Sequence, residues 1–236
     1  MPYVQEISKC LEELPSERYR DDSTTIEVRH SLVQFGKMLH AQGYVAACDG
    51  NLSVRLAAGC FMVTPTGVSK SMMQPENMVI VDTAGRKLWG DRKPTSEIAM
   101  HLTIYEMRPE IGAVIHAHPC TATAFASSGI ALDEPLCSEI VASLGSVPLA
   151  PYATPGTNEL SESLKAYIPG NDAILMANHG VVTYAEDLLH AYLKMEMVEH
   201  FAKIAFIARQ LGTRKPLNAS NVQKLLAMRT SPAERS

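Results

Sequence analysis

The spacing of hydrophobic and polar residues alternates along the chain between the helical period and the strand period. Residues 25–41 follow a mostly helical pattern, which Gln42 and Gly43 end. Residues 52–56 instead alternate between apolar and polar, as in a strand. The same criteria predict further helices over 94–108, 121–128, 157–167 and 187–212, strands over 60–64, 78–82, 87–89, 111–116, 172–177 and 180–184, and an extended segment over 146–150.

This mixture of helices and strands predicts one layered α/β domain. Residues 25–212 form the predicted domain, because the stretch contains no repeat, low-complexity tract or linker. Residues 1–24 are polar and charged and are expected to form an N-terminal arm. Residues 213–236 are expected to form a C-terminal tail with a short helix.

Composition narrows the possible functions. The 236 residues carry 21 Lys+Arg and 25 Asp+Glu, a net charge of −4, and 46% are hydrophobic. These values are typical of a globular protein, and they lack the basic charge of a nucleic-acid-binding domain. No stretch approaches the roughly 18 apolar residues of a membrane span. The N-terminal sequence lacks the basic and apolar regions of a secretory signal, so we expect a cytoplasmic protein without membrane contact.

The five cysteines, an odd number without C-x-x-C spacing, are expected to be buried and reduced: Cys10, Cys48, Cys60, Cys120 and Cys137.

Three of the eight histidines lie where two predicted strands end. His116 and His118 are two residues apart, so both imidazoles lie on one face of a strand. His179 ends another apolar strand, and Gly180 after it permits a close backbone approach. An H-x-H pair alone is weak evidence, but three neutral imidazoles suit Zn²⁺ with an open position for substrate. Other divalent ions also fit this set.

Glu97 is the natural acidic partner of this histidine set. It is expected in the first turn of the helix over 94–108, where the helix dipole favours a carboxylate. Stabilisation of the helix by this effect would be a sufficient reason for a glutamate here, without any role in a site. His101 lies four residues further on the same helix face. The two could bind metal together, but we expect His101 to support the site or to pack in the core.

Three short segments rich in Gly, Ser, Thr and Asn could bind an anion through backbone N–H groups: residues 50–53, 64–70 and 94–97. Each could equally be an ordinary turn or helix cap, and Thr95 or Ser96 suits an N-cap. Lys70 either adds positive charge there or is a solvated surface residue.

Taken together, the motifs G-N-L-S-V-R, T-P-T-G, P-T-S-E, H-A-H-P and N-H-G resemble those of the class II aldolase/adducin family, especially its L-fuculose-1-phosphate aldolases. The resemblance covers residues 25–212. It implies a single three-layer α/β/α domain around a central, mainly antiparallel sheet. It also implies a homotetramer with sites near the subunit interfaces.

The resemblance further implies a role for each residue that matches a motif. His116, His118 and His179 would bind the metal, usually zinc, and Glu97 would be the catalytic acid/base. The expected phosphate-binding residues are Asn51, Thr66, Gly67, Thr95 and Ser96. The implied reaction is metal-dependent cleavage of a ketose 1-phosphate to dihydroxyacetone phosphate and an aldehyde.

Two departures from the aldolase pattern keep alternatives open. The aldolases carry a tyrosine in the segment that matches residues 137–140, where this chain has none and Glu139 could face the same region instead. They also have a mobile C-terminal tyrosine, whereas no tyrosine follows Tyr192 here. Decarboxylation of a phosphorylated keto sugar acid is therefore the main alternative. Epimerisation is disfavoured, because the similar epimerases carry aspartate where Glu97 stands. A non-catalytic, adducin-like interaction module is less favoured, because adducin lacks the histidine set.

Overall fold

The computed structural model describes residues 23–56 and 59–228. Eight strands form one sheet in the order β4-β3-β2-β1-β5-β8-β7-β6. Their bounds are Lys87–Trp89 (β4), Val79–Val81 (β3), Phe61–Val63 (β2), Asn51–Arg55 (β1), Ala113–Ala117 (β5), Gly180–Ala185 (β8), Ala173–Met176 (β7) and Leu149–Ala150 (β6). Neighbouring strands are antiparallel except β6 and β7, which are parallel. The predicted mainly antiparallel sheet is confirmed.

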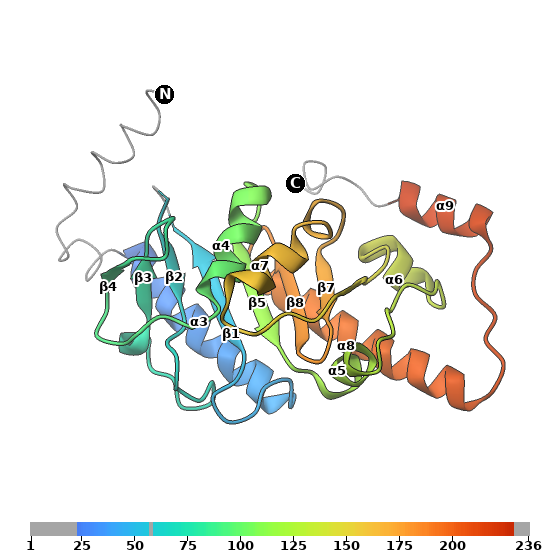
Figure 1. Cartoon of the computed structure of the whole chain (residues 1–236), viewed down its shortest axis with the longest axis horizontal. Helices are drawn as coiled ribbons and strands as arrows, with labels where there is room; N and C mark the ends of the chain where they lie inside the picture. Colours follow the sequence, from blue (N-terminus) through green and yellow to red (C-terminus); the bar gives the residue numbers. More distant parts are fainter. Residues whose placement is uncertain (1–22, 57–58, 229–236) are drawn as a thin grey trace, which may run out of the picture.

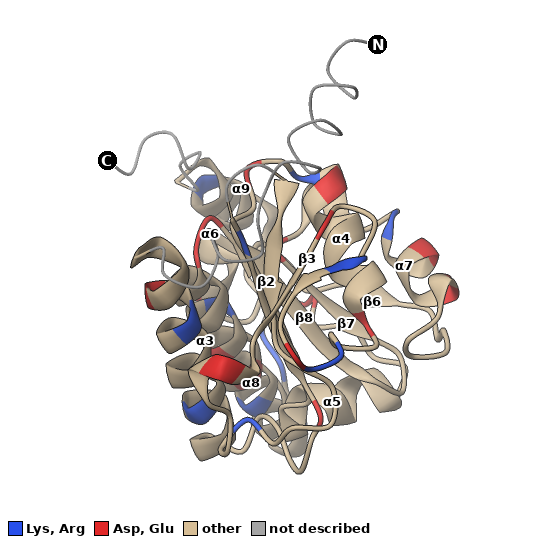
Figure 2. Ribbon diagram, turned by 90° about the vertical axis from the view of Figure 1, so that its left-hand side faces the viewer, with Lys and Arg blue, Asp and Glu red and all other residues tan. Residues whose placement is uncertain are grey.

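Helices cover both faces of this sheet (Figures 1 and 2). One face carries α3 (Ser23–Ala41), α5 (Cys120–Ser127) and α8 (Leu188–Gln210), and the other carries α4 (Ile98–Met107) and α7 (Asn158–Leu164). Two further short helices, α6 (Ser138–Ser143) and α9 (Ala219–Ala227), contact each other beside the sheet, and single 3-10 turns occupy Pro75–Asn77 and Ile168–Gly170. The three-layer α/β/α architecture is confirmed.

Alternation along the central strands divides the core into two layers. In β5, Ala113 and Ile115 pack in the layer with α3, α5 and α8, while Val114 packs in the layer with α4 and α7. Because side chains two residues apart share a strand face, the next residue on the α4 side is His116, which is completely buried. The strand period therefore turns the first predicted metal ligand toward α4.

Several local predictions were wrong, and packing explains them. The helix predicted over 94–108 begins only at Ile98, because an isolated bridge joins Pro94 to Pro65 and the Thr95 N–H donates to the Thr64 carbonyl. Neither Thr95 nor Ser96 is therefore the N-cap, which is Glu97. The helix predicted over 157–167 ends at Leu164, ahead of the 3-10 turn that contains Pro169. Helix α6 was not predicted.

The prediction that all cysteines are buried was also wrong, and of the two alternatives for Lys70 the solvated one is excluded. Cys48 and Cys120 are exposed rather than buried, whereas Cys60 is buried and Cys137 is half-buried. No disulfide joins the cysteines of the described part of the chain, and Cys10 lies outside it. Lys70 is buried rather than solvated, and its Nζ donates to the carbonyls of Val68 and Cys48 at 3.1 and 3.4 Å. Burial lowers the pKa of Lys70. This lysine therefore links the loop that contains Cys48 to the loop that contains Val68.

Among the described residues, no helix is both long enough and apolar enough to span a membrane. Helix α9 lies in the tail, where a short helix was predicted. The predicted arm lies outside the described residues except for Ser23 and Thr24, which begin α3.

Candidate metal centre and active site

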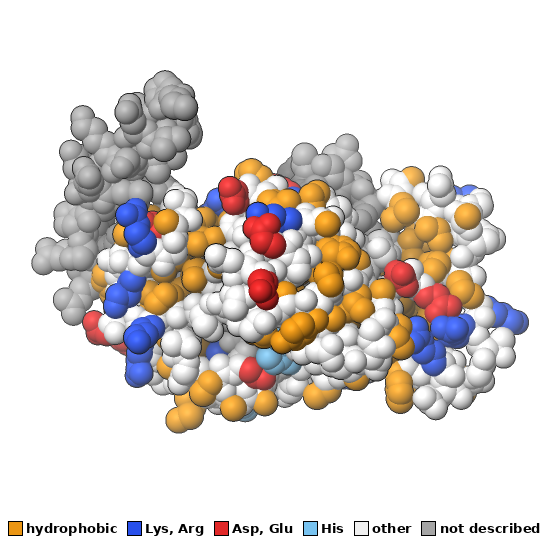
Figure 3. Space-filling view, viewed as in Figure 1, with side chains coloured by type: hydrophobic (Ala, Val, Ile, Leu, Met, Phe, Trp, Pro, Cys, Tyr) orange, Lys and Arg blue, Asp and Glu red, His pale blue; other side chains and the backbone are white. Residues whose placement is uncertain are grey.

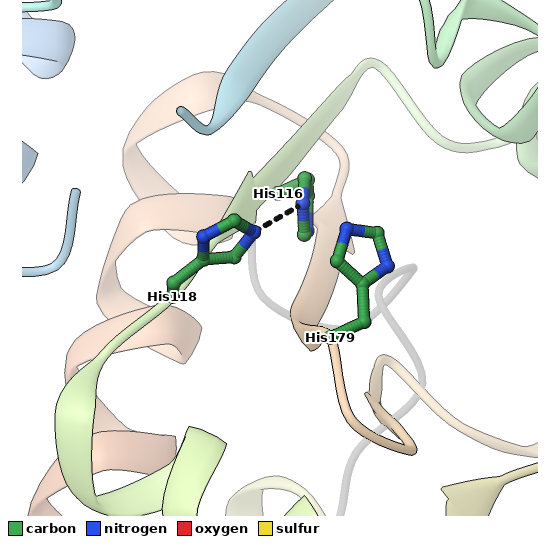
Figure 4. Close-up of side chains that lie close together, drawn as sticks. All are labelled: His116, His118 and His179. Atoms are coloured by element: carbon green, nitrogen blue, oxygen red, sulfur yellow. Dashed lines mark hydrogen bonds between the residues drawn. The ribbon is translucent and has the colours of Figure 1, made fainter. Parts of the chain in front are cut away.

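The structure brings His116, His118 and His179 together at the ends of strands in the middle of the sheet (Figure 4). His116 lies in β5, His118 follows that strand, and His179 lies in the turn between β7 and β8. One ligand atom from each ring lies within 4.8 Å of the other two. The ring centroids are 4.6 to 5.3 Å apart. The convergence expected from the two strand ends therefore occurs.

The backbone conformation of the turn before β8 allows the three histidines to converge. Asn178 has a φ of 55°, a left-handed conformation that asparagine tolerates better than most residues. A Cβ at Gly180 would lie 2.5 Å from His118 Cδ2 and 2.7 Å from the Ala117 carbonyl oxygen. Only glycine therefore allows β8 to pass this close to the histidines.

Hydrogen bonds fix the protons on two of the rings. His116 Nδ1 donates to the Val181 carbonyl at 2.9 Å, and His118 Nδ1 donates to the Asp49 carboxylate at 2.9 Å. The proton on each Nδ1 leaves a lone pair on the Nε2 of the neutral ring. These two Nε2 atoms face each other at 2.9 Å. Since burial lowers the pKa of His116, its ring stays neutral near pH 7.

Glu97 completes the cluster as predicted. Its Oε2 lies 3.3 Å from His116 Nε2, and its Oε1 lies 3.2 Å from His179 Nε2. Burial by itself raises the pKa of Glu97, but the His116 and His179 rings and the Asn51 amide outweigh it and hold the pKa below its usual range. The carboxylate is therefore ionised near neutral pH.

The donor set fits a divalent cation. Lone pairs of ring nitrogens and carboxylate oxygens crowd one point, and such an arrangement is repulsive unless a positive charge lies among them. Glu97 Oε1 and His179 Nδ1 are buried with no hydrogen-bond partner in the described part of the chain. Imidazole nitrogens with a carboxylate are ligands typical of zinc and similar metals.

The segments expected to bind phosphate lie side by side next to this cluster. Thr66 N–H donates to the Lys93 carbonyl, and Leu52 N–H donates to the Thr64 hydroxyl, so β1 and both loops are joined. Thr66, Gly67 and Ser96 are exposed, whereas Asn51 and Thr95 are buried. The backbone of Gly67 is left-handed, with a φ of 71°. The structure therefore gathers the five predicted residues around one region.

Two supporting groups were not predicted. The Asp49 carboxylate and the Val181 carbonyl each hold the Nδ1 of a histidine. Metal-binding histidines are commonly oriented in this way. Asp49 could have been found from the sequence, because it is an acidic residue directly before the G-N-L-S motif. The carbonyl could not, since any residue at position 181 supplies one.

Comparison with known proteins decides the family. Residues 30–206 match the family described as Class II Aldolase and Adducin N-terminal domain. The chain belongs to this family. The predicted family and fold are thereby confirmed, and class II aldolases require a divalent metal ion, for which the histidine cluster is the candidate site.

The relatives of this class II aldolase family member include both aldolases and decarboxylases. A 3-oxo-tetronate 4-phosphate decarboxylase from Haemophilus influenzae is 36% identical over 188 residues, 78% of this chain and 89% of the relative. A 5-deoxy-D-ribulose 1-phosphate aldolase from Bacillus thuringiensis serovar kurstaki is 32% identical over 199 residues, 84% of this chain and 92% of the relative. A solved L-fuculose 1-phosphate aldolase superposes with a TM-score of 0.81 at 33% identity, over 85% of this chain and 95% of that one. The expected enzyme class, a lyase, is confirmed.

Proposed function

We propose that the protein is a metal-dependent aldolase that cleaves a ketose 1-phosphate to dihydroxyacetone phosphate and an aldehyde. The observation that carries the proposal is the convergence of three histidines on the buried carboxylate of Glu97. Gathering buried hydrogen-bond acceptors lowers the stability of the fold. A non-catalytic, adducin-like role would not explain why the protein keeps such a cluster.

In this proposal His116, His118 and His179 hold a divalent cation, and we infer zinc from the nitrogen-rich donor set. The bound cation supplies a Lewis acid that stabilises the negative charge on the substrate's C2 oxygen. Asp49 and the Val181 carbonyl keep two of the rings in the tautomer that presents Nε2.

Glu97 is the proposed acid/base. Cleavage breaks the C3–C4 bond. The ionised Glu97 would accept the proton of the C4 hydroxyl, the C4–O group becomes the aldehyde, and the bonding electrons leave an enediolate on C2 and C3. Glu97 would then deliver that proton to C3, which gives dihydroxyacetone phosphate and restores the carboxylate.

Asn51, Thr66, Gly67, Thr95 and Ser96 are the proposed phosphate-binding residues. The exposed hydroxyls of Thr66 and Ser96 border the region where the loops meet. Binding the phosphate would hold C2 and C3 in a fixed orientation beside Glu97, which lowers the entropic part of the barrier.

Decarboxylation is the second candidate, favoured by the decarboxylase among the relatives. Loss of CO₂ from a phosphorylated 3-keto sugar acid leaves the same enediolate, which needs a proton at the same carbon. The two reactions differ in the fragment that leaves, and only aldol cleavage must also remove a hydroxyl proton from the substrate. The choice between the two reactions therefore depends on residues 137–140, the segment in which the aldolases carry a tyrosine. Glu139 is exposed in this segment, in the first turn of α6.

The deciding experiment offers the protein several ketose 1-phosphates and a phosphorylated 3-keto acid, with and without chelator. We expect chelator-sensitive release of dihydroxyacetone phosphate together with an aldehyde from a ketose 1-phosphate. Release of CO₂ from the keto acid, without turnover of any ketose 1-phosphate, would identify a decarboxylase. No product from either class would overturn both proposals.

We further propose that the active form is a cytoplasmic homotetramer. Exposed apolar side chains on α8 support the proposal, because a partner subunit could cover them: Leu189, Leu193, Phe206 and Ile207.

A further inference from the structure

A buried row of polar side chains continues from Glu97 away from the metal cluster. Asn51 Nδ2 donates to Glu97 Oε2 at 2.7 Å, and Asn51 Oδ1 lies 2.5 Å from His101 Nε2. The other ring nitrogen of His101 lies 2.7 Å from Ser53 Oγ, which lies 2.9 Å from the Tyr105 hydroxyl. We propose that His101 is a positioning residue, which acts through Asn51 to hold Glu97 in its working orientation.

The regular geometry of two elements creates this row. Asn51 and Ser53 are two residues apart in β1, and His101 and Tyr105 are four residues apart in α4. Residues at these spacings share one face of their element. The two faces pack together, so that the ring of His101 is inserted between Asn51 and Ser53.

The chemistry of the partners fixes the direction of every hydrogen bond. The Asn51 amide presents its NH₂ group to Glu97, so its oxygen faces His101. His101 therefore donates from Nε2, and its Nδ1 accepts from the Ser53 hydroxyl, which in turn accepts from Tyr105. His101 has the opposite tautomer to His116 and His118.

The burial of this row indicates what it does. His101 and Ser53 are fully buried, and Tyr105 is 2% exposed, so the row ends inside the core without reaching solvent. A path for proton exchange would have to reach solvent. A row that does not reach solvent can only fix the orientation of its side chains. Burial also lowers the pKa of His101 to about 4, which keeps the ring neutral throughout the neutral range.

Without His101, the Asn51 amide could rotate and turn its oxygen toward the Glu97 carboxylate. Two acceptors would then face each other, and the carboxylate would move away from C3. The inference rests on the proposed role of Glu97, so its test includes one measurement that does not require turnover.

That measurement is nuclear magnetic resonance of the metal-loaded protein labelled with ¹⁵N at histidine. The His101 signals are assigned by their loss in His101→Gln. We expect a neutral ring protonated at Nε2 from pH 8 down to pH 5. A ring protonated at Nδ1, or at both nitrogens in this range, would overturn the proposal even if no substrate had been found.

The second measurement is a double-mutant cycle on kcat with His101→Leu and Asn51→Ala. We expect His101→Leu to lower kcat by about 10- to 100-fold, the usual size for groups that support a site, with little change in KM or bound metal. If His101 acts through Asn51, the double variant is no worse than Asn51→Ala alone. An unchanged kcat in His101→Leu, or losses that multiply in the double variant, would contradict the role.

Two further variants keep the test decisive if His101→Leu fails to fold. His101→Gln keeps a donor for the Asn51 oxygen and should recover part of kcat. Ser53→Ala keeps the ring but removes the donor to Nδ1, and should lower kcat several-fold. Ser163→Ala, which removes a half-buried serine hydroxyl bonded to the Leu160 carbonyl, is the matched control and should leave kcat unchanged. Equal kcat in Ser53→Ala and Ser163→Ala would contradict the proposal.

Discussion

At the scale of single residues, the environment of each ionisable group decides its role. His116 and His101 are both completely buried and neutral, yet they present opposite ring nitrogens to the site. The difference comes from their partners: a carbonyl takes the Nδ1 proton of His116, and an amide oxygen takes the Nε2 proton of His101. A residue's type alone therefore does not define its role in the site.

Glu97→Gln tests the proposed acid/base. The amide keeps the shape of the side chain but cannot exchange a proton, so we expect kcat to fall by about 10²- to 10⁴-fold, the usual contribution of such a group. The histidines remain, so we expect metal content to be retained by elemental analysis. Full activity in a variant that holds metal would refute the role.

His101 should also make stability depend on pH. In the unfolded chain the pKa of His101 returns to the ordinary histidine value of 6.5, whereas in the folded protein burial lowers it to about 4. Below pH 6.5 the unfolded state binds a proton that the folded state does not, so stability falls as the pH falls toward 4. The loss reaches roughly 3 kcal/mol, at roughly 1.4 kcal/mol per pKa unit.

Urea unfolding of the wild type and His101→Gln between pH 4 and pH 8 measures this effect. Both proteins keep the other histidines, so the difference between them isolates His101. The stability curve of the variant should be flatter below pH 6.5. Parallel curves would show that the ring is not buried in its neutral form.

At the scale of elements, the sequence predicted what depends on local period, and it did not predict what depends on contact between distant segments. The strand patterns around His116 and His179 placed both at strand ends. The late start of α4 could not be predicted, because it results from the pairing of residue 94 with residue 65. The row from Asn51 to Tyr105 likewise exists only because β1 packs against α4.

Gly180→Ala tests the tight turn between β7 and β8. The new Cβ would contact His118 and the Ala117 carbonyl, so the turn must shift and the histidine cluster must open. We expect weaker metal binding by titration calorimetry and a stability loss of about 1–3 kcal/mol, as for other overpacked sites.

The matched control is Gly170→Ala, because nothing lies within 4 Å of a Cβ added there. It should bind metal like the wild type. Equal metal affinity of the two variants would argue against the proposed close approach.

At the scale of the whole molecule, the apolar surface predicts assembly. Hydrophobic side chains are exposed over α9 in the space-filling view (Figure 3), where Leu226 is exposed. Together with the exposed apolar residues of α8, they offer apolar surface that a partner subunit could cover. The family resemblance suggested a tetramer, but no pattern along one chain could show which surfaces would meet.

Light scattering during size-exclusion chromatography tests this prediction. We expect a mass four times that of the 25.7 kDa chain. Leu193→Asp and Phe206→Asp should weaken assembly, because each would bury a charge. Gln210→Asp, a change at an exposed position of the same helix, is the control. A wild type that stays monomeric at assay concentration would contradict the tetramer.

The central claim is that His116, His118 and His179 together hold one divalent metal ion. Elemental analysis of the purified wild type, His116→Ala and the exposed-histidine control His190→Ala tests it most directly. We predict about one equivalent of metal per chain in the wild type and in His190→Ala, and almost none in His116→Ala. Equal metal content in all three proteins would contradict the claim.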